Sequence, residues 1–121
     1  MFSVKEYLLA LVLIPILDAP WLLYQFNSSI EMFTKIQGGR SIESRMWAAV
    51  VVYLALAYLL LKQNSGQEAF LSGAAVYAVY DFTNLTLLKD YKVEFAVMDT
   101  LWGGVLFTAA FYALRYLKGA F

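Results

Sequence analysis

The chain has 121 residues, of which 62% are hydrophobic and 15% are charged, and its 9 basic and 9 acidic residues leave no net charge. A soluble domain of this size buries too little surface to hide so many apolar side chains, so the composition predicts an integral membrane protein. The balanced charge gives no attraction for nucleic acid, and the absence of cysteine and histidine removes disulfides, thiolate nucleophiles and the usual zinc ligands.

The first apolar stretch, at about 5–26, is long enough for a transmembrane helix, which needs roughly 20 residues. It contains Asp18, it is longer than the core of a signal peptide, and no small-residue cleavage site follows it. We therefore expect it to remain in the protein as a first span. Pro15 and Pro20 flank the aspartate, and a proline inside a helix tends to kink it.

A connecting segment follows the first span. Ser28 and Glu31 form an S-x-x-E capping pattern that opens the stretch 30–37, and Gly38 ends it. The apolar side chains of this stretch fall near one helical face: Ile30, Phe33 and Ile36. We expect a short amphipathic helix on the membrane surface between helices one and two, with an irregular loop as the alternative.

Three more apolar stretches follow, at about 43–62, 67–88 and 92–117. Ser65 and Glu68 form a capping box that opens the third span. The short connection KDYKVE predicts that the third and fourth helices are antiparallel neighbours. The sequence therefore predicts a single all-α domain over 1–121, an integral membrane bundle of four transmembrane helices with both termini on one side, side A.

Three acids, Asp18, Asp81 and Asp99, lie inside predicted spans. The opposite side of the bundle, side B, carries the connections 27–42 and 89–92. Counted at about 1.5 Å per residue, the three carboxyls lie roughly seven or eight residues, or about 10–12 Å, below side B. No lysine or arginine inside the spans pairs with them, and a bare carboxylate in lipid costs about 2.5–3.5 kcal/mol. Either some of them are protonated, or a bound cation holds them, or they line a wet pocket open to side B.

The third span carries polar side chains on one helical face. Gly73, Tyr77, Asp81 and Asn84 recur at helical spacing, so this stripe is expected to face the bundle. Asn84 is the expected hydrogen-bond partner of Asp81. Tyr91, by contrast, is expected in a belt of aromatic side chains at the membrane interface.

The pattern D-x-x-W occurs twice, as Asp18 with Trp21 and as Asp99 with Trp102, in spans that run in opposite directions. Residues three apart share a helix face, so each indole N–H can bond a carboxylate on a neighbouring helix. The second span brings Tyr53 to about the same depth. We therefore expect aromatic donors around the acids.

The stretch YDFTNLTLLKDY, followed by DTLWGG, resembles a family of small predicted four-helix membrane proteins, mostly bacterial, catalogued as domain of unknown function 2177. Its members also carry an Asp-x-x-Trp-Leu stretch near the N-terminus, similar to DAPWL here. The resemblance implies the four-helix fold and a site at the matching positions: Asp18, Trp21, Tyr80, Asp81, Thr83, Asn84, Asp99, Trp102 and Gly103. It implies no reaction, and neither it nor the residues identify a metal or a cofactor.

The candidate ligand- or ion-binding residues are Asp18, Trp21, Tyr53, Tyr77, Tyr80, Asp81, Thr83, Asn84, Asp99 and Trp102. We expect a small membrane protein that binds or moves a proton, a hard cation or a small polar molecule through this cluster, as a homo-oligomer with lipid around it. The alternative is a non-catalytic accessory subunit or lipid-binding protein of a larger membrane assembly. A lipid-modifying enzyme ranks last because the chain has no evident nucleophile, and the acids and aromatics also fit a purely structural role.

Overall fold

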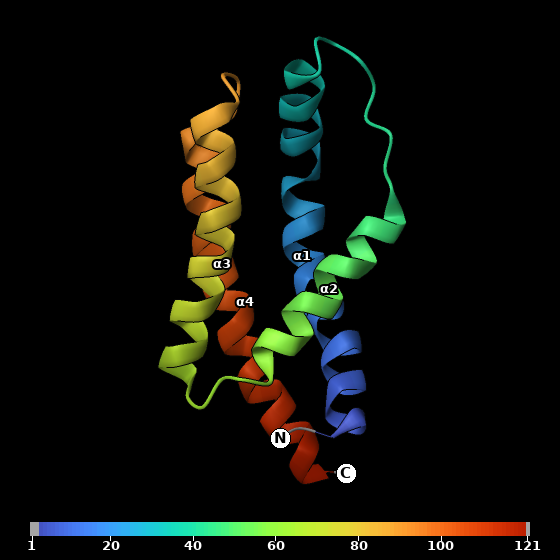
Figure 1. Cartoon of the computed structure of the whole chain (residues 1–121), viewed down its shortest axis with the longest axis vertical. Helices are drawn as coiled ribbons and strands as arrows, with labels where there is room; N and C mark the ends of the chain where they lie inside the picture. The colour runs from blue at the N-terminus through green and yellow to red at the C-terminus, as the bar shows by residue number, and fades with distance from the viewer. Residues whose placement is uncertain (1–2, 121) are drawn as a thin grey trace.

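The computed structural model describes residues 3–120. These residues form four α-helices: α1 (Val4–Ile36), α2 (Met46–Leu60), α3 (Gly66–Leu87) and α4 (Val93–Ala120). Figure 1 shows α1, α3 and α4 roughly upright, with α2 crossing α1 obliquely. The first turn of α1 and the last turn of α4 lie at one end of the molecule, side A, and the α3–α4 connection lies at the other, side B (Figure 1). The predicted all-α class is confirmed.

α4 is the central helix. It packs along α3 and also against α1, and α1 packs against α2. The main apolar core occupies the side-A half, between the first turns of α1 and the last turns of α4: Ala10, Ile14, Leu56, Ala57, Leu60, Ala69, Leu106, Phe107, Ala110, Phe111 and Leu114. A smaller apolar cluster near side B contains Met32, Tyr91 and Ala96. The level between these two clusters is where the buried acids lie.

The contact between α3 and α4 depends on two glycines. A side chain at Gly73 would meet the carbonyl of Gly103 and the side chain of Phe107. A side chain at Gly103 would meet the ring of Tyr77 and the carbonyl of Gly73. The two backbones are therefore close, as small residues permit in membrane helices, and the polar stripe of α3 is held against α4.

The start of α3 follows the predicted capping box. Ser65 Oγ accepts a hydrogen bond from the backbone N–H of Glu68 at 3.1 Å, and the Glu68 carboxylate accepts one from the N–H of Asn64 at 3.2 Å. These bonds occupy donors that a helix start otherwise leaves unpaired. α1 begins in the same way, because Ser3 Oγ accepts a hydrogen bond from the N–H of Glu6.

The predicted short helix over 30–37 is wrong as a separate element. α1 continues without a break to Ile36, so Ser28 lies inside a helix of 33 residues and caps nothing. The segment contains no glycine or proline to stop it, and Met32 and Phe33 pack against Tyr91 in the α3–α4 connection. This tertiary contact favours continuation of the helix, which reaches a length of about 50 Å. That length exceeds the roughly 30 Å hydrocarbon core of a bilayer.

The continuation of α1 changes the depth expected for Asp18. Asp81 lies six residues before Leu87, the last residue of α3, and Asp99 lies six residues after Val93, the first of α4. Asp18 lies much further, about 27 Å, from the side-B end of α1. The hydrogen bond from Trp102 places Asp18 about one helix turn further from side B than Asp99, which precedes Trp102 by three residues on α4.

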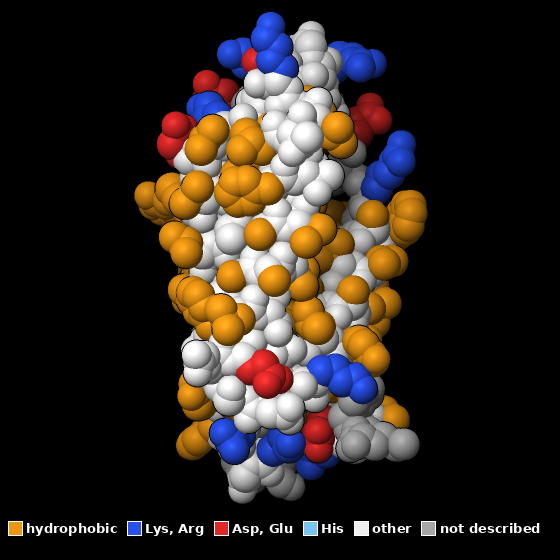
Figure 2. Space-filling view, turned by 60° about the vertical axis from the view of Figure 1, so that its left-hand side comes forward, with side chains coloured by type: hydrophobic (Ala, Val, Ile, Leu, Met, Phe, Trp, Pro, Cys, Tyr) orange, Lys and Arg blue, Asp and Glu red, His pale blue; other side chains and the backbone are white. Residues whose placement is uncertain are grey.

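Two helices, α1 and α4, are long and apolar enough to cross a bilayer, whereas α2 is apolar but has only 15 residues. The second span was expected from residue 43, but α2 begins at Met46, because the polar residues Glu43, Ser44 and Arg45 stay exposed and outside the helix. Figure 2 shows apolar side chains over the middle of one face and charged side chains gathered at its two ends. This distribution is that of a membrane protein.

Candidate functional site

Asp18 joins three helices. Its Oδ2 accepts a hydrogen bond from the hydroxyl of Tyr53 on α2 at 2.7 Å. Its Oδ1 accepts one from the indole N–H of Trp102 on α4, also at 2.7 Å. The side chain is 5% exposed, so a carboxyl buried on α1 has a donor on each oxygen.

Asp99 makes the corresponding bond in the opposite direction. Its Oδ1 accepts from the indole N–H of Trp21 at 2.8 Å, so α1 and α4 each supply one acid and one donor to the other. The rings of Trp21 and Trp102 stack between the two bonds, with centroids 5.9 Å apart and an interplanar angle of 21°. The prediction that each D-x-x-W indole bonds a carboxylate on a neighbouring helix is confirmed.

Asp81 has the least complete set of partners. Its side chain is 0% exposed, and its Oδ1 accepts a hydrogen bond from the hydroxyl of Tyr91 at 2.7 Å. Its Oδ2 is buried without a hydrogen-bond partner, and so is Oγ1 of Thr100. Both Asp99 and Thr100 of α4 adjoin the Asp81 carboxyl. Two carboxyls and one hydroxyl therefore meet in a buried place with bonds still unmade.

Tyr91, and not the expected Asn84, is the hydrogen-bond partner of Asp81. No hydrogen bond links Asn84 to Asp81 among the described residues, because the α3–α4 connection folds Tyr91 over the end of α3. Tyr91 is 4% exposed, and the rings of Phe33 and Phe95 meet it edge-on, so it is no interfacial belt residue. Burial raises the pKa of Tyr91, and the bond to Asp81 raises it further, so the phenol remains a donor.

The other expected site residues divide between two faces of α3. Tyr77 is half-buried against Gly103, and Asn84 is half-buried near Tyr91. Tyr80 is 53% exposed and Thr83 is also exposed, so neither is enclosed among the buried acids. The structure brings together the following expected residues: Asp18, Trp21, Tyr53, Asp81, Asp99 and Trp102.

Two contributors to the cluster were missed from the sequence. For Tyr91 the sequence contains one indication. Tyr91 lies in the short connection KDYKVE, so its side chain must stay close to the ends of the two helices. For Thr100 the sequence contains no such indication, because Thr100 directly follows Asp99 and adjacent residues do not share a helix face. Both Asp99 and Thr100 are at the cluster because α4 has neighbours on two sides, α1 and α3.

No basic side chain neutralises the cluster within residues 3–120. The ion pairs lie at the two ends of the bundle, with Lys35 and Asp90 3.9 Å apart at side B and Lys118 and Glu6 3.5 Å apart at side A. Across the same residues, no three acidic side chains form a group suited to hold a metal ion. The partners of the carboxyls are phenols, indoles and one another.

Comparison with known proteins gives a family. No curated protein and no solved structure matches the chain. A family model described as "Predicted membrane protein (DUF2177)" matches residues 3–115, a range that includes every residue of the acidic cluster. Together with two helices long and apolar enough to cross a bilayer, this match identifies a multi-pass membrane protein. The chain belongs to the DUF2177 family of predicted membrane proteins.

Proposed function

We propose that this membrane protein binds and releases a proton at the Asp81–Asp99 pair. The observation that carries the proposal is the Oδ2 atom of Asp81, which is fully buried, has no donor, and lies in a carboxyl that adjoins Asp99. Two carboxyls in contact do not both ionise readily, since like charges in a site of low dielectric repel. A proton held between them neutralises one charge and supplies the missing donor.

The surrounding groups favour a proton over a hard cation. Ca²⁺ takes six to eight oxygen ligands, and Mg²⁺ requires near-octahedral geometry. Both oxygens of Asp18 already accept bonds, from Tyr53 and Trp102. The indole N–H of Trp21 points at Asp99, and an N–H group repels a cation. The side chains around the carboxyls are therefore largely hydrogen-bond donors. Such donors stabilise an ionised carboxylate or a pair of carboxyls that shares one proton.

The two ends of the bundle offer different routes to this pair. On the side-A half, the apolar core that includes Ile14, Leu60 and Phe107 separates the acids from water. On the side-B half, Tyr91 and its small apolar cluster cover Asp81. The proposed exchange is accordingly with side B. Movement of the proton to side A would require a second conformation in which the core opens.

Infrared absorption of the carboxyl groups tests the proposal. In cation-free buffer near neutral pH, the parent is expected to show the C=O band of a protonated, buried carboxyl, and Asp81→Asn and Asp99→Asn should each remove or shift it. Asp18→Asn is the matched control, because both oxygens of Asp18 already have donors. A parent without any protonated-carboxyl band under these conditions would contradict the proposal.

We further propose that all four helices cross the membrane. α2 is apolar on all sides and leads back to the side-A end, where α3 starts (Figure 1). Asp81 on α3 is buried beside Asp99 and Thr100 of α4, and Leu71 and Val79 remain exposed on α3. Single cysteines at Ser3, Asn64 and Gly119 should react with an impermeant label from one face of sealed vesicles, and a cysteine at Ser41 from the other. Labelling of Asn64 from the same face as Ser41 would remove α2 from the list of spans.

The homo-oligomer and the accessory-subunit alternative stay predictions. A stable homo-oligomer of the purified chain would support the first. Co-purification at a fixed stoichiometry with a larger membrane complex would support the second, in which the acidic cluster has a structural role.

A further inference from the structure

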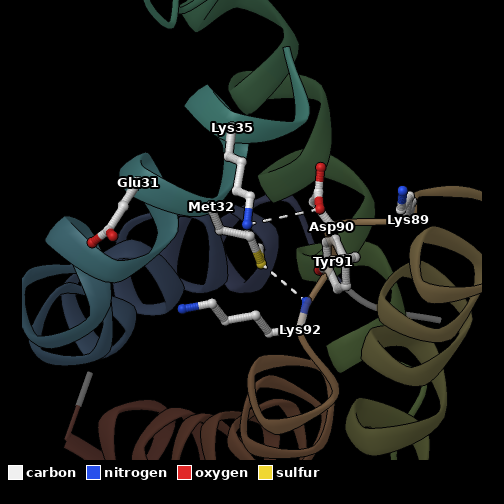
Figure 3. Close-up of a pocket in the computed structure, with 7 residues that line it drawn as sticks. All are labelled: Glu31, Met32, Lys35, Lys89, Asp90, Tyr91 and Lys92. Atoms are coloured by element: carbon white, nitrogen blue, oxygen red, sulfur yellow. Dashed lines mark hydrogen bonds and ion pairs between the residues drawn. The ribbon is translucent and has the colours of Figure 1, made fainter. Parts of the chain in front are cut away.

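A cavity of about 300 Å³ lies at side B, between the end of α1 and the α3–α4 connection. Figure 3 shows its lining residues: Glu31, Met32, Lys35, Lys89, Asp90, Tyr91 and Lys92. It is separate from the acidic cluster, because the buried ring of Tyr91 lies between the cavity and Asp81. The cavity exists because α1 continues past the first span and places its last turns beside the connection.

The floor of the cavity is fixed and apolar. Met32 is 2% exposed, and its sulfur accepts a hydrogen bond from the backbone N–H of Lys92 at 3.3 Å. Tyr91 is buried beside it and is tied to Asp81. The connection is thus held to α1 through Met32 and to α3 through Asp81, so the lysines on the rim start from a fixed backbone.

The rim carries more positive than negative charge. Lys35, Lys89 and Lys92 face the cavity together with two acids, Glu31 and Asp90. Lys35 pairs with Asp90 at 3.9 Å, and the two side chains are 74% and 36% exposed, so solvent screens this contact and it is weak. Figure 3 shows the Glu31 carboxylate directed away from the amino group of Lys35. Neither Lys89 nor Lys92 has an ion pair within residues 3–120.

The surface next to the cavity is apolar. Leu87 ends α3 and is 74% exposed, and Val93 begins α4 and is 56% exposed. Both lie one helix turn or less from the connection that lines the cavity, at the level where headgroups meet acyl chains if α3 and α4 span the bilayer. A ligand with an anionic group and attached hydrocarbon would contact the lysines and this apolar surface at once.

We propose that this pocket binds the phosphate group of an anionic membrane lipid. The amino groups of Lys35 and Lys92 approach the phosphate from α1 and from the connection, Lys89 adds charge at the rim, and Met32 and Tyr91 form the floor. Basic pockets between helices at a membrane surface bind anionic headgroups in this way. The inference does not depend on the proton-binding proposal, since no residue of the Asp81–Asp99 pair takes part.

Native mass spectrometry of the detergent-solubilised chain can test this site. The probes are phosphatidylglycerol, phosphatidylcholine and soluble glycerol phosphate. The parent should bind phosphatidylglycerol in preference to phosphatidylcholine. Lys35→Gln/Lys92→Gln should weaken that binding about 30-fold, since each lysine near an anionic lipid contributes roughly fivefold. Arg40→Gln/Arg45→Gln removes the same charge from the α1–α2 connection, outside the pocket, and should leave binding within about twofold of the parent.

Each other outcome counts against the site. Equal losses in the lysine and arginine double variants would mean attraction to the whole basic end instead of a pocket. Equal binding of soluble glycerol phosphate would assign the pocket to a water-soluble anion and would overturn the lipid. An unchanged affinity in the lysine variant would overturn the pocket itself. Thermal midpoints of both variants without added lipid show whether either one has lost its fold.

Discussion

Trp21 and Trp102 stack with their centroids 5.9 Å apart, and each donates its indole N–H to the aspartate that lies three residues before the other. The arrangement has approximate two-fold symmetry, because α1 and α4 run in opposite directions and carry the same D-x-x-W spacing. Each helix thus satisfies the buried acid of its partner. The bonds fix both the rotation and the register of α1 against α4.

Removing one of these donors should destabilise the fold. Trp102→Phe keeps a ring in place but leaves Oδ1 of Asp18 buried without a donor. We expect a loss of about 1–3 kcal/mol in the free energy of unfolding, the usual cost of a stranded buried acceptor. Unfolding in mixed micelles measures it, and Trp47→Phe on the exposed start of α2 is the control.

A double-mutant cycle separates the bond from the ring. If Trp102→Phe costs as much in an Asp18→Leu background as in the parent, the indole N–H contributes nothing to stability and only the stacking does. If the hydrogen bond contributes to stability, Trp102→Phe should cost less free energy of unfolding in the Asp18→Leu background, because no buried carboxylate oxygen then loses its donor.

Tyr91→Phe should destabilise the side-B half of the bundle. The change removes the one hydrogen bond that Asp81 accepts among the described residues, and the ring still packs against Phe33 and Phe95. We expect a loss of about 1–3 kcal/mol in the free energy of unfolding. Tyr116→Phe, at a position 77% exposed on α4, should change it by less than about 0.5 kcal/mol.

The same pair of variants has a pH signature. Burial raises the pKa of Tyr91 above its ordinary value, so its contribution to stability is complete below about pH 10 and falls as pH rises above that value. Unfolding followed from neutral to strongly alkaline pH should show a smaller alkaline loss in Tyr91→Phe than in Tyr116→Phe. Equal alkaline losses would mean that Tyr91 is not shielded from water in the native state.

The contacts between α1 and α4 were largely predictable from the sequence. Helical spacing places Asp18 and Trp21 on one face, and the three connections between α1 and α4, an odd number of chain reversals, give these helices opposite directions. The start of α3 was predictable for a similar reason, since the capping box of Ser65 and Glu68 involves only neighbouring residues.

Other features depended on packing that no local pattern carries. Ser28 and Glu31 also match a capping box, but α1 runs through them because Met32 and Phe33 are buried against Tyr91. Asn84 shares a face with Asp81, but the α3–α4 connection places Tyr91 closer to that carboxyl. In both cases the local sequence allows two structures, and a contact between segments distant in the sequence determines which one forms.

Gly73→Ala should separate α3 from α4. The added methyl group would meet the carbonyl of Gly103 and the side chain of Phe107, so the helices must move apart over the stretch that carries Asp81. We expect a loss of about 1–3 kcal/mol in the free energy of unfolding, the range for overpacked contacts. Gly119→Ala adds the same methyl group where nothing lies within 4 Å, and is expected to be neutral or slightly stabilising. Equal effects of the two changes would contradict the close contact.

Substitutions of Asp81 distinguish a neutral from an ionised carboxyl. If Asp81 holds the proton of the pair, asparagine is a near-isosteric neutral replacement. Its amide oxygen can accept from Tyr91 and its NH₂ group can donate to Asp99. Asp81→Asn should then unfold within about 1 kcal/mol of the parent while losing proton binding. Asp81→Leu keeps the branched shape but is larger and has no polar atom, so it leaves the Tyr91 hydroxyl without an acceptor and should be less stable than Asp81→Asn by about 1–3 kcal/mol.

The comparison is made by unfolding both variants at neutral and at acidic pH. Asp81→Asn should show a smaller change in stability with pH than the parent, because the pair can no longer exchange its proton. If Asp81→Asn is as unstable as Asp81→Leu at neutral pH, the native carboxyl contributes through its charge, and the shared proton is excluded. If both variants match the parent, the bond from Tyr91 contributes little, and the acids at this level have to be explained by the Asp18–Trp102 and Asp99–Trp21 pairs alone.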